Sequence, residues 1–416
     1  MELRINKNIP LIMHIDLNSC FATIEQQANP LLRGKPIVVA AYETPNGCVL
    51  APSIEAKRLG IKTGMRVKEA KLLCPDVIVR SSDPEKYRDV HQKFKKIFTD
   101  YSDIVVPKSI DEAVIDFRSM ERLKLDLVEI AKEIKQRMKK EIGEWIICSV
   151  GISVNRFLAK LAASLHKPDG LDLINHKNIE KIYGAITLLD LNGINLRFQA
   201  RLNAYGIFTP LDFLNAECET LEKNVFKSVL GRQWYERIRG YEVDDVEFKT
   251  KSIGQEYALK EWTSDPRKIC PMLMKLCEKM GRRLRRKSFI ARGIHVGMIY
   301  RDGTYWHRAR LTGEQMYTMM ELYRNALLIY NQQPEIKAIT KISVSCYDLS
   351  SNTKAQMTLF DIDVSKQRKT ANAMDDINHR YGEFVITPAL MMGMKDTILD
   401  RVPFGSTKDL EDLYGR

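Results

Sequence analysis

Two stretches decide the fold of this chain: IPLIMHID at residues 9–16 and SIDEAVIDF at residues 109–117. Each joins an apolar run typical of a buried strand to acids at one end. Asp16 closes the first stretch, and Asp111 and Glu112 precede the apolar run of the second. Because neighbouring residues of an ideal strand point to opposite faces, Asp111 and Glu112 can share a site only at a turn or an irregular strand start. We therefore expect a local distortion there.

Carboxylates that converge from these two stretches predict a metal site. Three such groups repel one another and stay ionised at neutral pH only when cations lie between them. Hard oxygen ligands without Cys or His favour Mg²⁺, with Mn²⁺ as a substitute. Two ions about 3.5–4 Å apart stabilise both the attacking and the leaving oxygen of a phosphoryl transfer. Taken singly, each acid is more often a turn or helix-cap residue. Together, beside buried strands, the three acids favour a metal site.

The composition bounds the class of protein. A chain of 416 residues, 44% of them hydrophobic, is long enough for more than one folded domain. Its eight cysteines show no CxxC spacing, which predicts neither a zinc site nor a disulfide framework and suits a reducing cytoplasm. There is no signal-peptide pattern and no apolar run near the ~20 residues of a membrane span. We expect a cytoplasmic monomer without membrane contact.

The positive charge is concentrated in one region. The net charge is +12, and the segment 275–310 holds eleven Lys or Arg against two acids. Residues 251–360 carry most of the excess. A concentrated positive surface is typical of a protein that binds a polyanion, although a short charge run is often just a solvated helix face.

The periodicity predicts an α/β (α+β) chain built from two mixed units joined by short helices. The first unit interleaves strand candidates with helix candidates such as 85–101 and 155–165. Short helices follow over 175–245, where residues 192–207 resemble a helix-hairpin-helix that would offer backbone N–H groups to phosphates. A plain helical turn is the alternative. The second unit has strand candidates 254–259, 293–300 and 339–347, helix candidates 267–287 and 314–330, and a further helix candidate 370–381 beyond it.

Several longer motifs resemble the Y-family DNA polymerases, the DinB and UmuC enzymes of translesion synthesis. These are DLNSCFA at 16–22, SIDEA at 109–113, VGIS at 150–153, HKPDG at 166–170 and KSIG at 251–254, in the family's order. The resemblance implies a right hand with a palm, small fingers, a helical thumb and a C-terminal α/β little finger. The implied domains are palm 1–19 and 83–174, fingers 20–82, thumb 175–245, linker 246–250, little finger 251–360 and a tail 361–416 without an assigned role.

The same resemblance assigns roles to residues. Asp16, Asp111, Glu112 and the Leu17 carbonyl would hold two Mg²⁺ ions, and Phe21 would be a steric gate that excludes a ribose 2′-hydroxyl. The implied nucleotide-binding residues are Ser19, Cys20, Phe21, Lys57 and Lys167. The implied DNA-binding residues are Gly193, Asn195, Lys251, Arg282, Arg283, Arg285, Arg286 and Arg292. QMTLF at 356–360 resembles the sliding-clamp-binding peptide of bacterial polymerases, with Gln356, Leu359 and Phe360 as contacts; an edge strand is the alternative.

The chain departs from the DinB pattern in the fingers. Ala51, Ile54 and Lys57 stand where DinB-type members have Thr, Tyr and Arg near the triphosphate, which removes directional phosphate contacts but keeps a charge. This stretch is closer to the UmuC branch, so both branches stay open, as does the need for an accessory subunit. Leu17 replaces a more usual Phe or Val, and Asn195 replaces a thumb glycine.

The implied function is template-directed, low-fidelity DNA synthesis in damage tolerance. A primer 3′-hydroxyl would attack a dNTP on primer-template DNA, and the absence of a second acidic cluster predicts no proofreading. Two rivals remain. A different two-metal palm enzyme, such as a nucleotidyl cyclase, would need no basic second domain. A non-catalytic scaffold that binds DNA and the clamp would need no acid triad.

Overall fold

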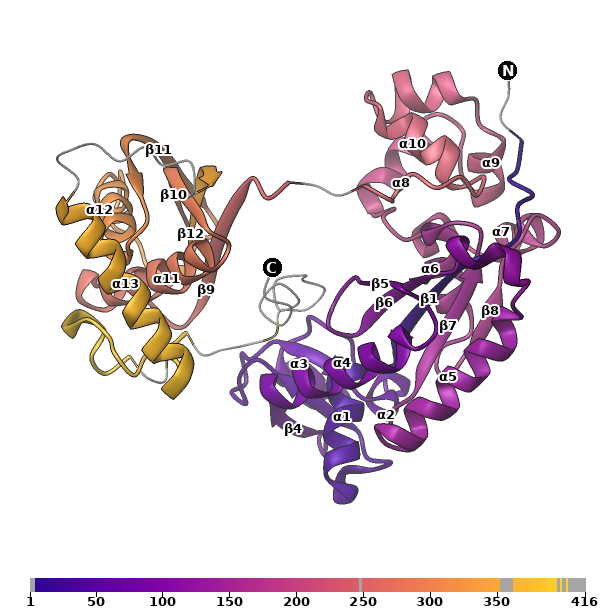
Figure 1. Cartoon of the computed structure of the whole chain (residues 1–416), viewed down its shortest axis with the longest axis horizontal. Helices are drawn as coiled ribbons and strands as arrows, with labels where there is room; N and C mark the ends of the chain where they lie inside the picture. The colour runs from indigo at the N-terminus through magenta and orange to yellow at the C-terminus, as the bar shows by residue number, and fades with distance from the viewer. Residues whose placement is uncertain (1–3, 247–248, 352–361, 395–396, 399–401, 403–416) are drawn as a thin grey trace. The chain divides into compact units, whose positions relative to one another are not determined.

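The computed structural model describes residues 4–246, 249–351, 362–394, 397–398 and 402. The chain forms two compact units, one made mainly of residues up to Val246 and the other mainly of Glu247–Asp400 (Figure 1). Both units mix strands and helices, as the sequence predicts. Among the described residues, no helix is both long and apolar enough to cross a membrane.

A five-stranded sheet forms the centre of the first unit, with the order β5-β6-β1-β7-β8. Its central strand β1 pairs antiparallel with both β6 and β7, and the first of these pairings sets Asp16 opposite Glu112. The strands are β1 (Ile12–Leu17), β5 (Ile104–Pro107), β6 (Glu112–Asp116), β7 (Cys148–Ser153) and β8 (Leu171–Leu173).

Helices cover both faces of this sheet. The larger apolar core joins Met13 and Ile15 of β1 to side chains of α4 (Pro84–Thr99) and α5 (Leu127–Glu141). On the other face, Ile12 packs with Ala159 of α6 (Arg156–Leu165). That approach requires a glycine on β7, because a Cβ on Gly151 would lie 2.1 Å from the Ala159 carbonyl oxygen. Side chains alternate along β1, so Asp16 lies on the α6 face together with Ile12.

A small sheet with the order β3-β2-β4 lies within the residues predicted to be the fingers. Two short helices lie in this region, and the residues between them include Gly60 and Gly64, both with positive φ. The elements are α1 (Cys20–Ala28), a 3₁₀ turn Pro30–Leu32, β2 (Ile37–Ala40), β3 (Val49–Pro52), α2 (Ile54–Arg58), α3 (Val67–Leu73) and β4 (Ile78–Ser81). A second 3₁₀ turn, Arg118–Leu123, lies between β6 and α5.

Short helices follow β8, which confirms the pattern expected for 175–245. They pack around an apolar cluster that contains Tyr183, Phe213 and Trp234 and reaches Leu158 of α6. The elements are α7 (Ile179–Ala185), a 3₁₀ turn Leu188–Asp190, α8 (Leu196–Asn203), α9 (Pro210–Asn215), a π turn Thr220–Val225 and α10 (Leu230–Arg237).

The second unit contains a four-stranded antiparallel sheet, with the order β11-β10-β12-β9 and with α11 and α12 packed against it and each other. The expected helix 314–330 is wrong at its start, because residues 305–316 form a strand. That strand lies at the sheet edge and is exposed on both sides, so it lacks the apolar alternation of a half-buried strand. The elements are β9 (Ser252–Thr263), α11 (Pro266–Arg286), β10 (Phe289–Tyr300), β11 (Tyr305–Met316), α12 (Met319–Tyr330) and β12 (Ile339–Ser351).

The helix predicted at 370–381 is longer than expected and belongs to the second unit. It is α13 (Ile362–Tyr381), and Asp375 on it accepts two hydrogen bonds from Arg285 of α11, at 2.5 and 2.9 Å. Further on, Lys275 Nζ donates to the carbonyls of Met394 and Thr397 at 2.8 and 2.6 Å. A 3₁₀ turn, Ala389–Met391, lies in this segment. The little finger predicted at 251–360 therefore packs against residues beyond its expected end.

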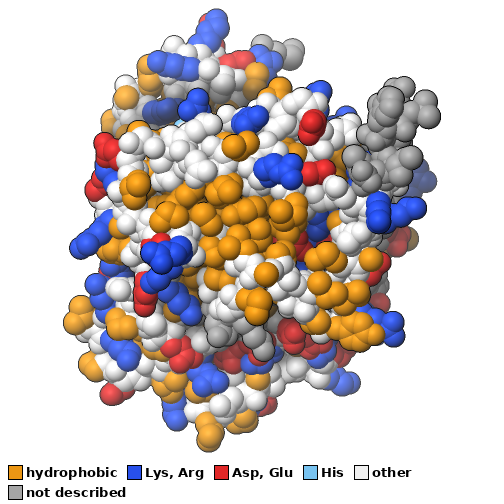
Figure 2. Space-filling model, turned by 90° about the vertical axis from the view of Figure 1, so that its left-hand side faces the viewer, with side chains coloured by type: hydrophobic (Ala, Val, Ile, Leu, Met, Phe, Trp, Pro, Cys, Tyr) orange, Lys and Arg blue, Asp and Glu red, His pale blue; other side chains and the backbone are white. Residues whose placement is uncertain are grey.

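Apolar side chains also gather at the surface. On the face shown in Figure 2 they form one continuous area with charged side chains around it. Large exposed hydrophobic residues of the second unit include Met320, Leu328, Ile377 and Tyr381. Patches of this kind often mark interaction sites, but no described segment indicates what would cover this one.

Candidate active site

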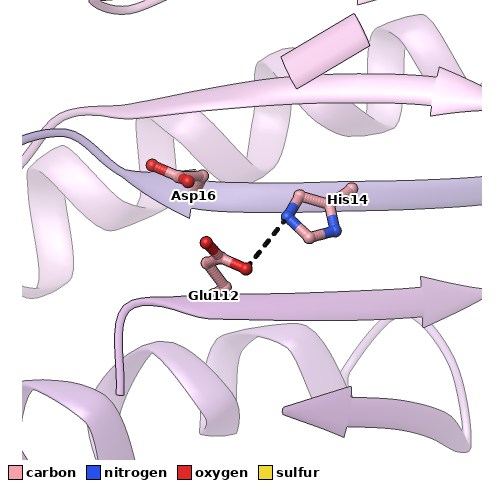
Figure 3. A group of neighbouring side chains, drawn as sticks. All are labelled: His14, Asp16 and Glu112. Carbon is pink, nitrogen blue, oxygen red and sulfur yellow. Dashed lines mark ion pairs between the residues drawn. The ribbon is translucent and has the colours of Figure 1, made fainter. Parts of the chain in front are cut away.

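The carboxylates of Asp16 and Glu112 converge because β1 and β6 are neighbours in register (Figure 3). Glu112 is the first residue of β6, and Asp111 lies in the bend before it. The Leu17 N–H donates to the Asp111 carbonyl at 2.9 Å, which fixes the bend against the end of β1. The irregular strand start expected from the sequence is confirmed.

His14 is a site residue that the sequence analysis missed. It lies on the same strand face as Asp16, and its Nε2 is 3.6 Å from Glu112 Oε2. His14, Asp16 and Glu112 each offer one atom, and these atoms lie within 4.8 Å of one another. Burial lowers the pKa of His14 to about 3, so the imidazole is neutral at pH 7. The site therefore contains a nitrogen donor that the sequence analysis did not include, and the expected all-oxygen ligand set stays a prediction.

Asp111 does not belong to that closest group. Its Oδ1 instead accepts a hydrogen bond from Ser109 Oγ at 2.5 Å. Burial raises the pKa of Asp111, although the hydrogen bond from Ser109 acts to lower it. Two of the three predicted acids thus share one small site, and the third lies beside it with its own partner.

Two lysines neutralise the converging acids. Lys167 Nζ lies 2.8 Å from Asp16 Oδ1, and Lys160 Nζ lies 2.7 Å from Glu112 Oε2. Burial raises the pKa of Asp16 to about 6, in spite of Lys167. Burial also acts to raise the pKa of Glu112, but the nearby ammonium groups of Lys160 and Lys167 act in the opposite direction, and this pKa is lowered. The site is therefore rich in compensating charge, as converging carboxylates require.

Asn18 positions the loop that carries Lys167, and the sequence analysis did not identify it. Asn18 Oδ1 accepts hydrogen bonds from the Asp169 N–H at 2.7 Å and from Ser149 Oγ at 3.1 Å. These bonds tie residues 166–170 to the end of β1. A polar residue two positions after Asp16 was the signal in the sequence, and a turn explains such a residue equally well.

The residues expected near a nucleotide begin α1. Ser19 Oγ is buried and has no hydrogen-bond partner among the described residues. Burial, followed by Asp111 and Asp16, raises the pKa of the Cys20 thiol well above its usual value. Phe21 is only 3% exposed and stacks on Tyr87 with ring centroids 4.3 Å apart. It is therefore a core residue at a position next to the acids, and its role as a gate stays a prediction.

Lys57 extends from α2 toward the same acids. Its pKa is lowered, first by desolvation and then by Lys167, while Asp16 and Asp111 oppose the shift. A lowered pKa is expected for a partly buried amine that has a second ammonium group nearby. On the neighbouring β3 and α2, Ala51 is buried and Ile54 is partly buried, and neither side chain can hydrogen-bond a phosphate.

In the predicted thumb hairpin, Asn195 caps its own helix. Its Oδ1 accepts hydrogen bonds from the N–H groups of Arg197 and Phe198, both at 3.0 Å. Gly193 just before it has φ +100°. The Asn195 side chain thus already pairs two backbone donors at the start of α8, and the expected DNA contacts of Gly193 and Asn195 stay a prediction.

The eight expected DNA contacts differ in exposure. Arg285 is only 4% exposed and bonds Asp375, and Arg282 is 13% exposed and lies 3.3 Å from Glu278. Arg285 is buried, so the prediction that it faces DNA is wrong, whereas Arg282 is partly buried and its contact with DNA stays a prediction. Arg283 is partly buried and donates to the Gly254 carbonyl at 3.0 Å. The remaining basic residues of the set, Lys251, Arg286 and Arg292, are exposed. The expected clamp contacts Gln356, Leu359 and Phe360 lie outside the described residues.

Comparison with known proteins places the chain in a family. Models of the impB/mucB/samB family match residues 15–164, and models of its C-terminal domain match residues 250–359. The DNA polymerase IV of Moorella thermoacetica is 33% identical over 388 residues, which cover 92% of this chain and 96% of that protein. The DNA polymerase IV of Pelotomaculum thermopropionicum is 31% identical over 396 residues, covering 94% of this chain and 97% of the relative.

Solved structures agree on the fold. A chimeric Y-family DNA polymerase superposes with a TM-score of 0.70 at 24% identity, covering 82% of this chain and 100% of its own. The insertion ternary complex of Dbh DNA polymerase gives a TM-score of 0.56, also at 24% identity and with the same coverage. The family match over residues 15–164 contains Asp16, Asp111, Glu112 and Lys160 of the acidic site. The chain belongs to the impB/mucB/samB family, the Y-family of DNA polymerases.

Proposed function

We propose that this protein carries out template-directed, low-fidelity translesion DNA synthesis, adding dNTPs to a primer 3′-hydroxyl without proofreading. One observation carries the proposal. Asp16 and Glu112 converge from neighbouring strands, and the lysines 2.8 and 2.7 Å away balance their charge. A buried site of this charge, in a chain of this family, suits a reaction between phosphates.

The donor set fits a divalent metal. Asp16 and Glu112 offer carboxylate oxygens close together, and Asp111 and the Leu17 carbonyl lie at the adjoining strand ends. We assign these four groups to Mg²⁺, for which Mn²⁺ can substitute. When bound, such ions make the primer hydroxyl more acidic and stabilise the pyrophosphate that leaves. His14 stays neutral beside them, with its Nε2 atom 3.6 Å from Glu112 Oε2.

The surrounding residues would orient the nucleotide. Lys167, held by the loop that Asn18 anchors, presents one ammonium group at the acidic site, and Lys57 presents a second from α2. We propose that both bind the triphosphate as point charges. Ser19, whose Oγ is buried without a partner among the described residues, and Cys20 would adjoin the nucleotide at the start of α1.

Phe21 should determine sugar selection. Replacing Phe21 with Leu shortens the ring edge that would meet a ribose 2′-hydroxyl, so the preference for dNTPs over rNTPs should fall by about tenfold to a hundredfold. Leu is the better variant because Phe21 stacks on Tyr87 in the core, where an Ala would leave a cavity. Single-nucleotide insertion with dCTP and rCTP, read as the ratio of kcat/KM values, measures the effect. A ratio equal to that of the unmodified protein would exclude Phe21 as the gate.

DNA contacts are proposed for the exposed basic residues alone. Lys251, Arg286 and Arg292 lie on the surface of the second unit, the part of the chain with the largest positive excess. Arg283 is left out because it bonds within the unit. We further propose that Gln356, Leu359 and Phe360 bind the bacterial sliding clamp, supported by the sequence QMTLF between β12 and α13.

Two further proposals follow from the same reading. An accessory subunit is required only if the altered fingers at Ala51 and Ile54 make the isolated protein inactive. A cytoplasmic location is supported by the state of the cysteines, since all eight are free thiols, as a reducing compartment requires.

Primer extension tests the proposed function. The purified full chain, with Mg²⁺ and dNTPs, should extend a primer on an undamaged template and across an abasic site, adding few nucleotides per binding event. Extension on neither template, with DNA binding intact, would favour the scaffold reading or a missing accessory subunit. Formation of a cyclic nucleotide without any need for DNA would favour the cyclase reading.

A further inference from the structure

Lys160 contacts a carboxylate that the proposed chemistry needs. It lies on α6, which packs against the sheet face that carries Asp16 and Glu112, and its Nζ is 2.7 Å from Glu112 Oε2. One turn earlier on the same helix, Arg156 lies 3.8 Å from Asp116, at the other end of β6. The helix thus directs two basic side chains onto two acids of one strand.

The contact between Lys160 and Glu112 is a close hydrogen bond, and the lysine side chain can leave it. An ammonium 2.7 Å from a carboxylate oxygen forms a charge-assisted hydrogen bond with the oxygen that faces it. Lys160 is 39% exposed, whereas Glu112 is 18% exposed, so the lysine can swing into solvent while the acid stays in place. A flexible four-carbon chain makes such a movement inexpensive.

The other acids of the site do not share this partner. Lys167 lies on Asp16, and Ser109 bonds Asp111. His14 approaches the same Oε2 atom of Glu112 as Lys160 but is neutral. Lys160 is therefore the cation, among the described residues, that is bonded directly to Glu112.

We propose that Lys160 is a positioning residue that holds Glu112 until a divalent ion takes its place, so that metal binding at this site is an exchange of one cation for another. The inference rests on the proposed function, which assigns Glu112 to the metal. Two opposite charges at hydrogen-bond distance stabilise each other, so the ion must displace this interaction before it gains its own. The released ammonium group of Lys160 would then be able to attract a phosphate at the same site. Metal binding would in this way be coupled to phosphate binding.

The exchange predicts that removal of the lysine charge strengthens metal binding. In the full chain without DNA or nucleotide, Lys160→Met should bind Mn²⁺ about threefold to tenfold more tightly than the unmodified protein. Electron paramagnetic resonance of free Mn²⁺ during a titration measures this without any need for catalysis. Lys160→Arg keeps the charge and should leave the affinity unchanged. Lys93→Met removes a distant surface charge that pairs with Asp89 and is the matched control.

The Glu112→Gln variant separates this inference from the proposed function. If this variant weakens Mn²⁺ binding but Lys160→Met binds no more tightly than the unmodified protein, the exchange is overturned and the metal site stands. If Glu112→Gln leaves Mn²⁺ binding unchanged, the assignment of the metal site fails and the exchange fails with it. Tighter binding in Lys160→Met that disappears in the double variant with Glu112→Gln supports the exchange.

Discussion

Replacing Glu112 with Gln is expected to slow nucleotide addition by at least about a thousandfold, or about 4 kcal/mol in the activation free energy. The change keeps the side-chain size and removes the charge that Lys160 now balances at 2.7 Å and that a metal would use. The pKa of Glu112 is lowered, so the side chain is ionised at neutral pH and the variant removes a full negative charge. DNA affinity should stay within about twofold, because Glu112 is not one of the basic surface residues proposed to bind the DNA phosphates.

Single-turnover primer extension at saturating dNTP and Mg²⁺ measures the loss, and fluorescence anisotropy with labelled primer-template measures DNA affinity. Glu121→Gln is the matched control, since it makes the same chemical change at an exposed position. Retention of more than about a tenth of the original rate by Glu112→Gln would show that the reaction does not depend on the Glu112 carboxylate. Thermal unfolding of the variant checks that a loss of rate does not come from a fold defect.

The sequence predicted the acids of this site because their signal is local. An apolar run that ends in an acid marks a strand end, and the Asp111–Glu112 pair required an irregular strand start. Both features depend on a few neighbouring residues. The structure places Glu112 at the first position of β6 and Asp111 in the bend before it, as this reasoning requires.

The sequence did not predict His14, because its role depends on strand pairing. Within an apolar run, His14 looks like one more buried strand residue. It becomes part of the site only because β6 is the neighbour of β1 and brings Glu112 within 3.6 Å. The sequence did not predict the helix cap made by Asn195 for a related reason. Whether its carboxamide turns back onto Arg197 and Phe198 depends on the backbone conformation before α8, which residue identities alone do not specify.

The basic helix shows the same limitation on a larger scale. The charge count of 275–310 treated each arginine as a surface residue. Arg285 instead meets Asp375, which lies 90 positions later in the chain on α13. No local pattern can predict an ion pair between two helices that are so far apart in sequence. The tail that received no role from its sequence thus supplies a partner for a buried charge.

This ion pair leads to the second large effect, on stability. Asp375→Ala should destabilise the packing of α13 on α11 by about 2–4 kcal/mol. Arg285 is 4% exposed, and with Asp375 removed it would keep the Tyr317 carbonyl at 3.0 Å and Glu278 at 3.9 Å. Two hydrogen-bond donors of a buried guanidinium would then lack their acceptors, and the loss of such a partner costs more than the loss of an exposed ion pair.

Hydrogen exchange of the full chain, followed by mass spectrometry, localises this effect. Peptides from α11 and α13 should exchange faster in Asp375→Ala, while peptides from β1 and α5 in the first unit should be unchanged. Asp376→Ala is the matched control, because Asp376 is the adjacent acid of the same helix and is exposed. Equal exchange in the two variants would mean that the Arg285 contact contributes no more than a surface charge. Faster exchange confined to the Asp375 variant would mean that α13 is a structural part of the second unit, held by a buried ion pair.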